Sequence, residues 1–445
     1  MKVFLGEIIS GVFSGRAYPA SSAFFDLAFL VFLLATVAYL VYLAGRKDLW
    51  WKIGVGASAV AAVLMTLALA FRWVAAGWDH PPFTNLYESL VFFAWGIVVL
   101  YLFLEWRYQV KVAGAFIIPL ACITMGLASL SPNKAIEPLV PALQSIWLHL
   151  HVMVASIGYA AFLAAFAFAV LYFVKDKVRL EWFVLTVGAF TVLAILAATK
   201  GSVFTLQYLT DAFTMKNGVW IKKALPATAH GAQPIIQQIV VPGVGSLLLL
   251  SLITGLVAVG NAIFNIVKTE ESLSTISQYA VMLTFALFTL SMIVLLVQLG
   301  RMPAARLAGN PYSFAMLVLV WLGWLFALIA TQRYDSLVEA LPPVKTLDRM
   351  TYNTVMIGFP LMTLVIITGA IWANQAWGRY WGWDPKETAS LVTWLIYLLF
   401  LHTRLTQGWT GRRSMIIAVI GFASVVFTYL GVNLLLSGLH AYATG

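Results

Sequence analysis

Charged residues are scarce in this 445-residue chain, and cysteine is almost absent. Only 10% of the residues are charged and 62% are apolar or aromatic, whereas a soluble globular protein carries about 25% charged residues. So few charges exclude a water-soluble domain, which would expose large apolar patches. The single cysteine, Cys122, excludes an internal disulfide, a cysteine zinc site and a CxxC redox pair. A mean hydropathy of +0.92 and repeated apolar runs instead indicate a polytopic membrane protein.

Apolar windows of about 19 residues predict twelve transmembrane spans and therefore an all-α fold. We expect residues 1–445 to form one membrane domain, and we expect Met1 to Ala17 to be retained because no convincing cleavage site follows them. The predicted spans lie near residues 24–44, 53–72, 89–106, 112–130, 149–174, 182–199, 238–264, 278–299, 313–330, 352–373, 389–404 and 415–437.

The formal net charge of +10 raises the question of a nucleic-acid partner. The basic residues stand singly or in pairs between apolar runs, so orientation in a membrane explains them better and we expect no nucleic acid. Loops after the odd-numbered spans hold 15 of the 27 basic residues in roughly 70 loop residues, and the other loops spread 12 over roughly 130. This density predicts that the first set is cytoplasmic and that both termini lie outside.

One predicted external loop concentrates aromatic and charged residues. Residues 377–387, WGRYWGWDPKE, hold four aromatic and four charged side chains. An aromatic belt at the membrane interface explains one or two tryptophans, but it does not explain the glycines beside them, which let a flat ligand approach the backbone. The loop favours a large planar ligand with acidic edges, whose carboxylates meet Arg379 or Lys386.

The histidines are the next candidates for this site, and the chain has six: His80, His149, His151, His230, His402 and His440. His151 and His440 share the predicted depth and side of the aromatic loop, as bis-histidine ligation of haem iron requires. His149 is turned about 160–200° from His151 on a helix, so only one of them faces the site. His402 is about 21 Å below the outer end of its span. It is a functional candidate by its depth, or else a histidine hydrogen-bonded to a neighbouring helix.

The run from Leu347 to Tyr442 resembles the C-terminal part of the CcsA (ResC-type) cytochrome c synthesis proteins, a haem-handling group named for its Trp-Trp-Asp loop. The matching stretches there are LDRMTYNTVMIGFPLMTLVIITGAIWA, WGRYWGWDPKETASLVTWLIYLLFLHTR and GVNLLLSGLHAY. Two earlier stretches also match, PPFTNLYESLVFFAW and WLHLHVMVASIGYAAF. Residues of about 50–175 and 345–445 therefore form the expected haem-handling core.

The resemblance implies that the chain moves haem b outward and presents it to apocytochrome c, whose CxxCH thiols add to the haem vinyl groups. It implies a CcsB- or ResB-type membrane partner, and a thiol-reducing protein is a further partner to consider. The external iron ligands are then His151 and His440, and His402 is an inner ligand whose counterpart comes from the partner. The haem-binding residues expected in the loop are Trp377, Gly378, Trp381, Gly382, Trp383 and Asp384, of which the three tryptophans hold the haem plane. Asp384, Lys386 and Glu387 either brace the loop or meet the haem propionates, and which of them does which stays open.

The same resemblance implies the inner membrane of a bacterium or a thylakoid-type membrane, with the site on the extracytoplasmic side. Whether the chain is itself the thioether-forming enzyme stays open, as do the roles of His80, His149 and His230. Residues 180–340 depart from the family pattern, because four predicted spans intervene where most relatives have less chain. Four is an even number, so this insertion leaves the sidedness of the expected haem ligands unchanged.

Three rival functions remain. The first is a haem exporter or chaperone without ligation activity, and the second is a membrane b-type haem redox protein that exchanges electrons with quinone. A third reading is the haem-chaperone branch of the same loop family. That branch lacks the LYESL segment present here, so it is disfavoured.

Overall fold

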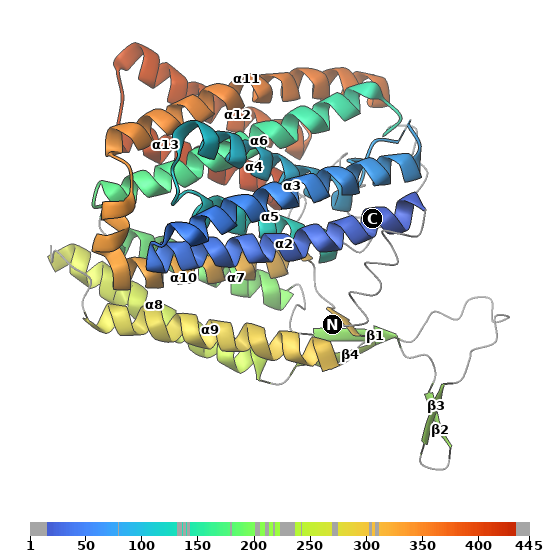
Figure 1. The fold of residues 1–445 in the computed structure, drawn as a ribbon, viewed down its shortest axis with the longest axis horizontal. Helices are drawn as coiled ribbons and strands as arrows, with labels where there is room; N and C mark the ends of the chain where they lie inside the picture. The colour runs from blue at the N-terminus through green and yellow to red at the C-terminus, as the bar shows by residue number, and fades with distance from the viewer. Residues whose placement is uncertain are drawn as a thin grey trace. The chain divides into compact units, whose positions relative to one another are not determined.

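Twelve α-helices make up most of the chain that the computed structural model describes (Figure 1). The described residues are 16–78, 80–130, 136, 139, 143–178, 180–200, 205–209, 213–216, 219–222, 236–241, 243–268, 275–301, 305–307 and 311–432. The helices are α2 (Ala17–Gly45), α3 (Asp48–Ala76), α4 (Leu86–Tyr108), α5 (Gly114–Leu130), α6 (Ile146–Lys175), α7 (Leu180–Lys200), α8 (Val244–Lys268), α9 (Thr275–Arg301), α10 (Pro311–Ala340), α11 (Val344–Trp377), α12 (Pro385–Gln407) and α13 (Arg412–Val426), which a π-helical turn, Phe427–Gly431, continues.

Each of these helices overlaps one predicted span. Nine of them are long and apolar enough to cross a membrane, among the residues described, and the chain is a multi-pass membrane protein. Three carry shorter apolar stretches: Gly114–Ser129, Leu180–Val192 and Val320–Ile329. The 17-residue α5 is about 26 Å long, which is less than the ~30 Å hydrocarbon core of a bilayer. The count of twelve full spans, and the side on which the termini lie, stay predictions.

The contacts divide the chain into two compact units. One unit contains Met1–Val178 and Asp335–Gly445, and the other contains Arg179–Tyr334, so the boundary crosses α10. All of the described candidate site residues belong to the first unit. A single membrane domain over residues 1–445, with a family-like core and extra helices at 180–340, stays a prediction.

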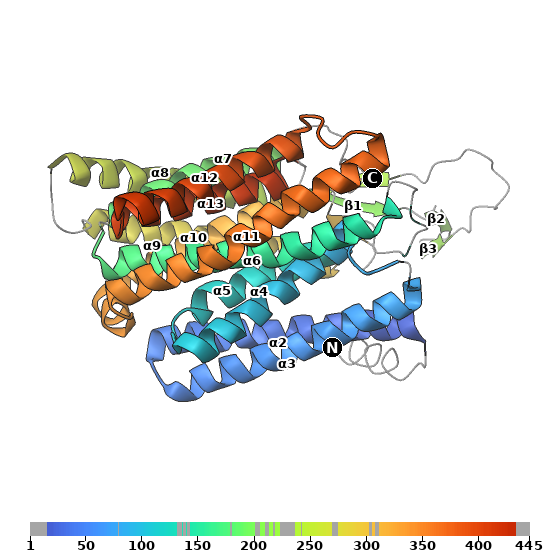
Figure 2. The same ribbon diagram turned by 90° about the horizontal axis from the view of Figure 1, so that it is seen from above.

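The centre of the first unit is the antiparallel pair α6 and α11, which lie side by side in both views (Figures 1 and 2). Glycines let the two backbones approach, as is usual between membrane helices. A Cβ at Gly358 of α11 would lie 2.6 Å from the Phe162 ring of α6, and one at Gly158 of α6 would lie 3.3 Å from Leu361. Helix α6 is buried along most of its length. It is therefore a fixed support for any group that it carries.

Basic side chains bind backbone and carboxylate oxygens at one end of this unit. The Arg46 guanidinium donates to the Ser336 carbonyl at 2.7 Å, and the Lys175 ammonium donates to the Val338 carbonyl at 2.7 Å. Lys111 pairs with Asp48 at 2.9 Å. These lysines and Arg46 follow the first, third and fifth predicted spans. The loops that the predicted topology groups on one side therefore do meet at one end of the unit.

The second unit has its own core, and its described residues include five short strands. Trp324 is fully buried there, and its indole N–H donates to the Thr191 hydroxyl at 2.9 Å. The all-α prediction did not include the strands: β1 (Thr205–Leu209), β2 (Phe213–Lys216), β3 (Val219–Lys222), β4 (Ile236–Val240) and β5 (Ala305–Leu307). They form an antiparallel sheet of order β4-β1-β5, with Thr205 opposite Val240, and a β2–β3 pair with Phe213 opposite Lys222. Asn-Gly separates β2 from β3 in the sequence, and this dipeptide favours two-residue hairpins.

Candidate functional site

Four segments of the first unit enclose a cavity of about 220 Å³. The lining residues lie within 83–93, 143–159, 365–390 and 428–429. Most of them are apolar or aromatic, and Lys386 and Glu387 are the charged residues that line it. An apolar hollow with a few convergent polar groups is typical of a small-molecule site. The predicted topology places the loops 73–88, 131–148 and 374–388 on one side, and the cavity joins residues from all three.

His151 lies in the wall of this cavity. Its Nδ1 is 2.9 Å from the backbone carbonyl oxygen of Val365 on α11. Because a carbonyl oxygen only accepts, Nδ1 carries the proton and the Nε2 atom keeps the lone pair that binds a metal. The imidazole also stacks beside the buried Trp372, with ring centroids 6.2 Å apart and an interplanar angle of 29°. Gly369 makes room for the ring, because a Cβ there would lie 2.9 Å from it.

The aromatic loop begins where α11 ends and closes where α12 begins. Gly378 is the left-handed cap of α11, with φ +72°, a conformation that glycine adopts without strain. Trp381 lines the cavity together with Tyr380. Trp383 is 70% exposed. Trp377 packs edge-on against Trp372, with ring centroids 5.0 Å apart. The predicted tryptophans therefore occupy three different environments, and only Trp381 of the three lines the cavity.

Two carboxylates brace this loop. Asp384 is buried and accepts from the backbone N–H of Lys386 at 3.2 Å, and it forms a capping box with Glu387 at the start of α12. The Glu387 carboxylate accepts from the backbone N–H groups of Gly382 and Asp384, at 2.8 and 3.1 Å. Sequence reasoning left open whether Asp384, Lys386 and Glu387 brace the loop or meet carboxylates of a ligand. The structure shows that Asp384 and Glu387 satisfy backbone donors.

The two basic residues of the loop differ in position. Lys386 lines the cavity. The Arg379 guanidinium lies over Gly382, where a Cβ would be 2.8 Å from its Cζ atom. Of the two cations proposed to meet acidic edges of a ligand, Lys386 is therefore the one beside the cavity.

His402 lies on a different part of α12, about 26 Å along the helix from Pro385. It is exposed within a stripe of exposed apolar side chains on the same helix: Val392, Leu395, Leu399 and Leu405. The Arg404 guanidinium, two residues further on, binds both oxygens of Asp348. His402 does not line the cavity, and its role as a separate, inner haem ligand stays a prediction. His440 and His230 lie outside the described residues.

Part of the cavity wall is formed by residues that were not among the predicted site residues. Phe83, Thr84 and Asn85 line the cavity from the loop between α3 and α4. Tyr429 lines it from the turn that follows α13, and its hydroxyl is 3.2 Å from that of Ser89. The available signal was the resemblance of the PPFTNLYES stretch to the family, which selected the segment but not the residues within it.

Comparison with known proteins supplies the family. The model of the cytochrome C assembly protein family matches residues 83–440, which include the cavity wall, the aromatic loop and all three predicted haem-ligating histidines. The chain belongs to this family. The resemblance predicted from the sequence motifs is thereby confirmed, and family membership supports a role in cytochrome c biogenesis.

Relatives in cyanobacteria are similar over nearly their whole length. The cytochrome c biogenesis protein CcsA of Nostoc punctiforme is 32% identical over 95% of this chain and 96% of its own. The CcsA proteins of Gloeobacter violaceus and Synechocystis sp. are each 32% identical over 94% of this chain, and over 94% and 96% of their own. These matches run across nearly the whole length of both chains, so they do not test whether residues 180–340 are extra relative to most other relatives. That part of the expectation stays a prediction.

Proposed function

We propose that the protein binds haem b at the cavity on the extracytoplasmic side and presents it to apocytochrome c for covalent attachment. The observation that carries this proposal is the His151 imidazole in the cavity wall, with its Nδ1 proton held by the Val365 carbonyl. A histidine that ligates a metal usually donates a hydrogen bond from its other ring N–H in this way, which fixes both the tautomer and the ring orientation. His440, expected just beyond the last span, is the proposed second axial ligand.

The rest of the cavity suits a planar, largely apolar substrate with acidic groups at one edge. Trp381 and Tyr380 offer aromatic faces for its plane. Lys386 offers a positive charge that can pair with a propionate. The neighbouring Glu387 carboxylate is engaged by two backbone N–H groups of the loop. The protein then contributes ligation, stacking and charge pairing, and it orients haem for the reaction.

The reaction requires no nucleophile from this chain. Each cysteine thiol of the CxxCH motif adds across a haem vinyl group: the sulfur bonds to one vinyl carbon, the thiol hydrogen ends on the other, and a thioether results. No external oxidant or reductant enters this balance. Holding the two reactants in place is worth several kcal/mol of the barrier. We propose that this orientation is the catalytic contribution of the protein, as a component of the synthase.

The exposed stripe of α12 supports a second, inner contact. His402 lies among apolar side chains that face away from the packed interior of the unit. We propose that a CcsB- or ResB-type membrane partner covers this stripe and supplies the histidine opposite His402. Haem would pass this point on its way to His151. The location that follows is the inner membrane of a bacterium or a thylakoid-type membrane, and a thiol-reducing protein would keep the cytochrome cysteines reduced.

The absorption spectrum of the purified full-length protein tests the proposal. We expect a low-spin bis-histidine haem spectrum in the wild type, and we expect His151→Ala or His440→Ala to lose it while still inserting into the membrane. Added imidazole should restore part of the low-spin signal, because it can fill the vacant axial position. His230→Ala, in the polar segment between predicted spans six and seven, is the control and should keep the wild-type spectrum.

Two results would contradict the proposal. Wild-type spectra and normal cytochrome c maturation in both ligand variants would show that neither histidine binds the iron. Haem binding without any thioether product, in a reconstitution with apocytochrome c and the partner, would favour the rival function of a haem exporter.

A further inference from the structure

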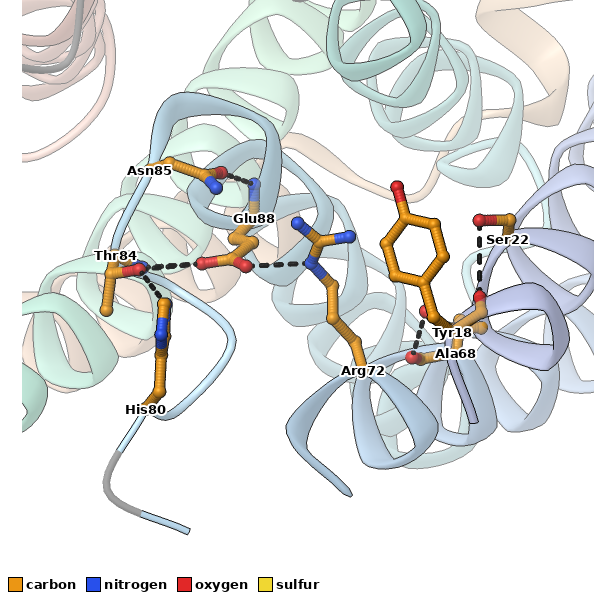
Figure 3. A network of polar contacts seen from close by, with 9 residues as sticks. Tyr18, Ser22, Ala68, Arg72, His80, Thr84, Asn85 and Glu88 are labelled. Carbon is orange, nitrogen blue, oxygen red and sulfur yellow. Dashed lines mark hydrogen bonds and ion pairs between the residues drawn. The ribbon is translucent and has the colours of Figure 1, made fainter. Parts of the chain in front are cut away.

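A buried row of polar side chains stands behind the cavity wall formed by residues 83–85. Figure 3 shows Arg72, Glu88, Thr84 and His80 joined in sequence by hydrogen bonds; these four residues are called the Arg72–Glu88 row below. Arg72 comes from α3, Glu88 from the first turn of α4, and the other two from the loop between these helices. The exposed fractions of Arg72, Glu88 and His80 are 3%, 0% and 8%.

The Glu88 carboxylate is the centre of the row. One of its oxygens lies 2.7 Å from the Arg72 Nε, and the other accepts from both the backbone N–H and the hydroxyl of Thr84, each at 2.9 Å. A fully buried charge is tolerated only when it is paired and its lone pairs are satisfied. Arg72 also lies over the Tyr87 ring, 4.8 Å from its centroid. The row is therefore fully bonded at its carboxylate and fixes α3 against α4.

Counting protons gives the hydrogen bonds a direction. The Thr84 hydroxyl has one proton, and it donates that proton to the Glu88 carboxylate, which only accepts. Toward the His80 Nε2, 2.9 Å away, the hydroxyl can therefore only accept. His80 must donate from Nε2. The Thr84 hydroxyl thus links His80 to the Arg72–Glu88 ion pair.

The same residue faces the cavity. Thr84 lines it, between Phe83 and Asn85, which also line it. The Phe83 ring stands edge-on to His149, with centroids 5.9 Å apart, and His149 lies two residues before His151 on α6. Residues 80–83 are buried, and two of them are prolines. Buried loops are unusual because their backbone polar groups need partners, and here the row supplies some of them.

We propose that Thr84 is a positioning residue of the haem site, held by Glu88 and Arg72 on one side and by His80 on the other. It sets the position of the part of the cavity wall formed by residues 83–85. This inference rests on the proposed function, because the position of the wall matters only if the cavity holds haem. Thr84 acts through the wall and is not an iron ligand.

Thr84→Val and Thr84→Ser test the role of the hydroxyl. Valine keeps the shape of threonine but cannot bond, whereas serine keeps the hydroxyl. The purified full chain is loaded with haemin, and the loss of haem to an excess of haem-free myoglobin is followed by absorption. The loss of one buried hydrogen bond predicts release about five- to tenfold faster in Thr84→Val. Thr84→Ser should release haem near the wild-type rate, and the bis-histidine spectrum should persist in both variants.

A double-mutant cycle separates positioning from a general effect on folding. His80→Leu removes the same link from its other end, so it should speed haem release by itself and add little in the Thr84→Val background. Because His80→Leu leaves Glu88 paired, it also serves if Thr84→Val does not fold. Thr124→Val is the matched control: Thr124 is buried on α5, bonds its own helix carbonyl, and does not line the cavity.

The outcomes distinguish this inference from the proposed function. Wild-type release rates in both Thr84→Val and His80→Leu would overturn the positioning role, as would equal acceleration in Thr84→Val and Thr124→Val, or fully additive effects in the cycle. His151→Ala in the same assay tests the haem site itself. An unchanged rate in that variant would overturn both proposals.

Discussion

The Nδ1 atom of His151 lies 2.9 Å from the backbone carbonyl oxygen of Val365, which is 214 residues later in the sequence, on helix α11. The backbone of α11 therefore fixes the tautomer of a ring that α6 carries. Gly369, one turn beyond Val365, leaves the space that the ring fills. The orientation of the imidazole thus depends on the packing of these two helices.

The first prediction uses this close approach. Gly369→Ala places a Cβ 2.9 Å from the His151 ring, so the ring must move. We expect a weakened iron–histidine bond, seen as a partial change from low-spin to high-spin haem, with the ligand still present. Overpacking of this kind costs about 1–3 kcal/mol. Absorption spectra of the purified variant check the change.

Gly56→Ala is the matched control, because a Cβ at Gly56 meets nothing within 4 Å. It should keep the wild-type spectrum and gain slightly in thermal stability, since alanine is a better helix former than glycine. Equal spectra in the two alanine variants would contradict the assignment of His151 as an iron ligand oriented by α11.

The second prediction separates two tryptophans that the sequence treats alike. Trp381 lines the cavity, whereas Trp383 is 70% exposed. Trp381→Ala should lose more haem than Trp383→Ala, because a buried aromatic side chain covers about 150–250 Å². Haem content per protein, measured after purification, gives the comparison. The reverse order would indicate that haem lies on the outer surface of the loop, and full retention in the double variant would favour an aromatic belt.

Sequence reasoning predicted the helices well because long apolar runs have few alternatives in a membrane. It also grouped the loops of the cavity on one side, because the parity of the spans determines this grouping. It did not find Thr84, since a threonine before a helix is an ordinary turn or capping residue. Its role depends on Glu88 and His80, and the hydrogen bonds among these three became visible only in the structure.

The aromatic loop shows the opposite limit. Its composition marked it as a site, but composition does not say which face of a short loop turns inward. The capping box of Asp384 and Glu387 fixes that choice, and it places Lys386 at the cavity and Trp383 outside it. The sequence also did not predict strands β2 and β3, because they are four-residue segments within a polar stretch between apolar spans.

The third prediction concerns the acidic edge of the substrate. Lys386 lines the cavity and Arg379 does not, so Lys386→Ala should weaken haem binding more than Arg379→Ala. A charge-assisted hydrogen bond is worth about 1.5–3 kcal/mol, which corresponds to roughly ten- to hundredfold in affinity. Haem whose propionates are esterified should bind the wild type and Lys386→Ala about equally. A Lys386→Ala variant that still discriminates between the two forms of haem would show that another group binds the propionates.

The last prediction concerns His402, which separates a transit route from a single surface site. It is exposed in the apolar stripe of α12, about 26 Å along the helix from Pro385, so haem at His151 cannot reach it. A polar side chain facing lipid is costly unless a partner satisfies it, and a histidine of the membrane partner with shared haem would do so. His402→Ala in the complex with that partner should then lower total haem, while the haem that remains keeps the spectrum of the outer site.

Thr406→Val, one turn further along α12, is the control: its hydroxyl donates to the His402 carbonyl, so its loss removes no ligand. Normal haem loading and normal cytochrome c output in His402→Ala would contradict an inner site, and haem would then have to reach His151 without passing this histidine.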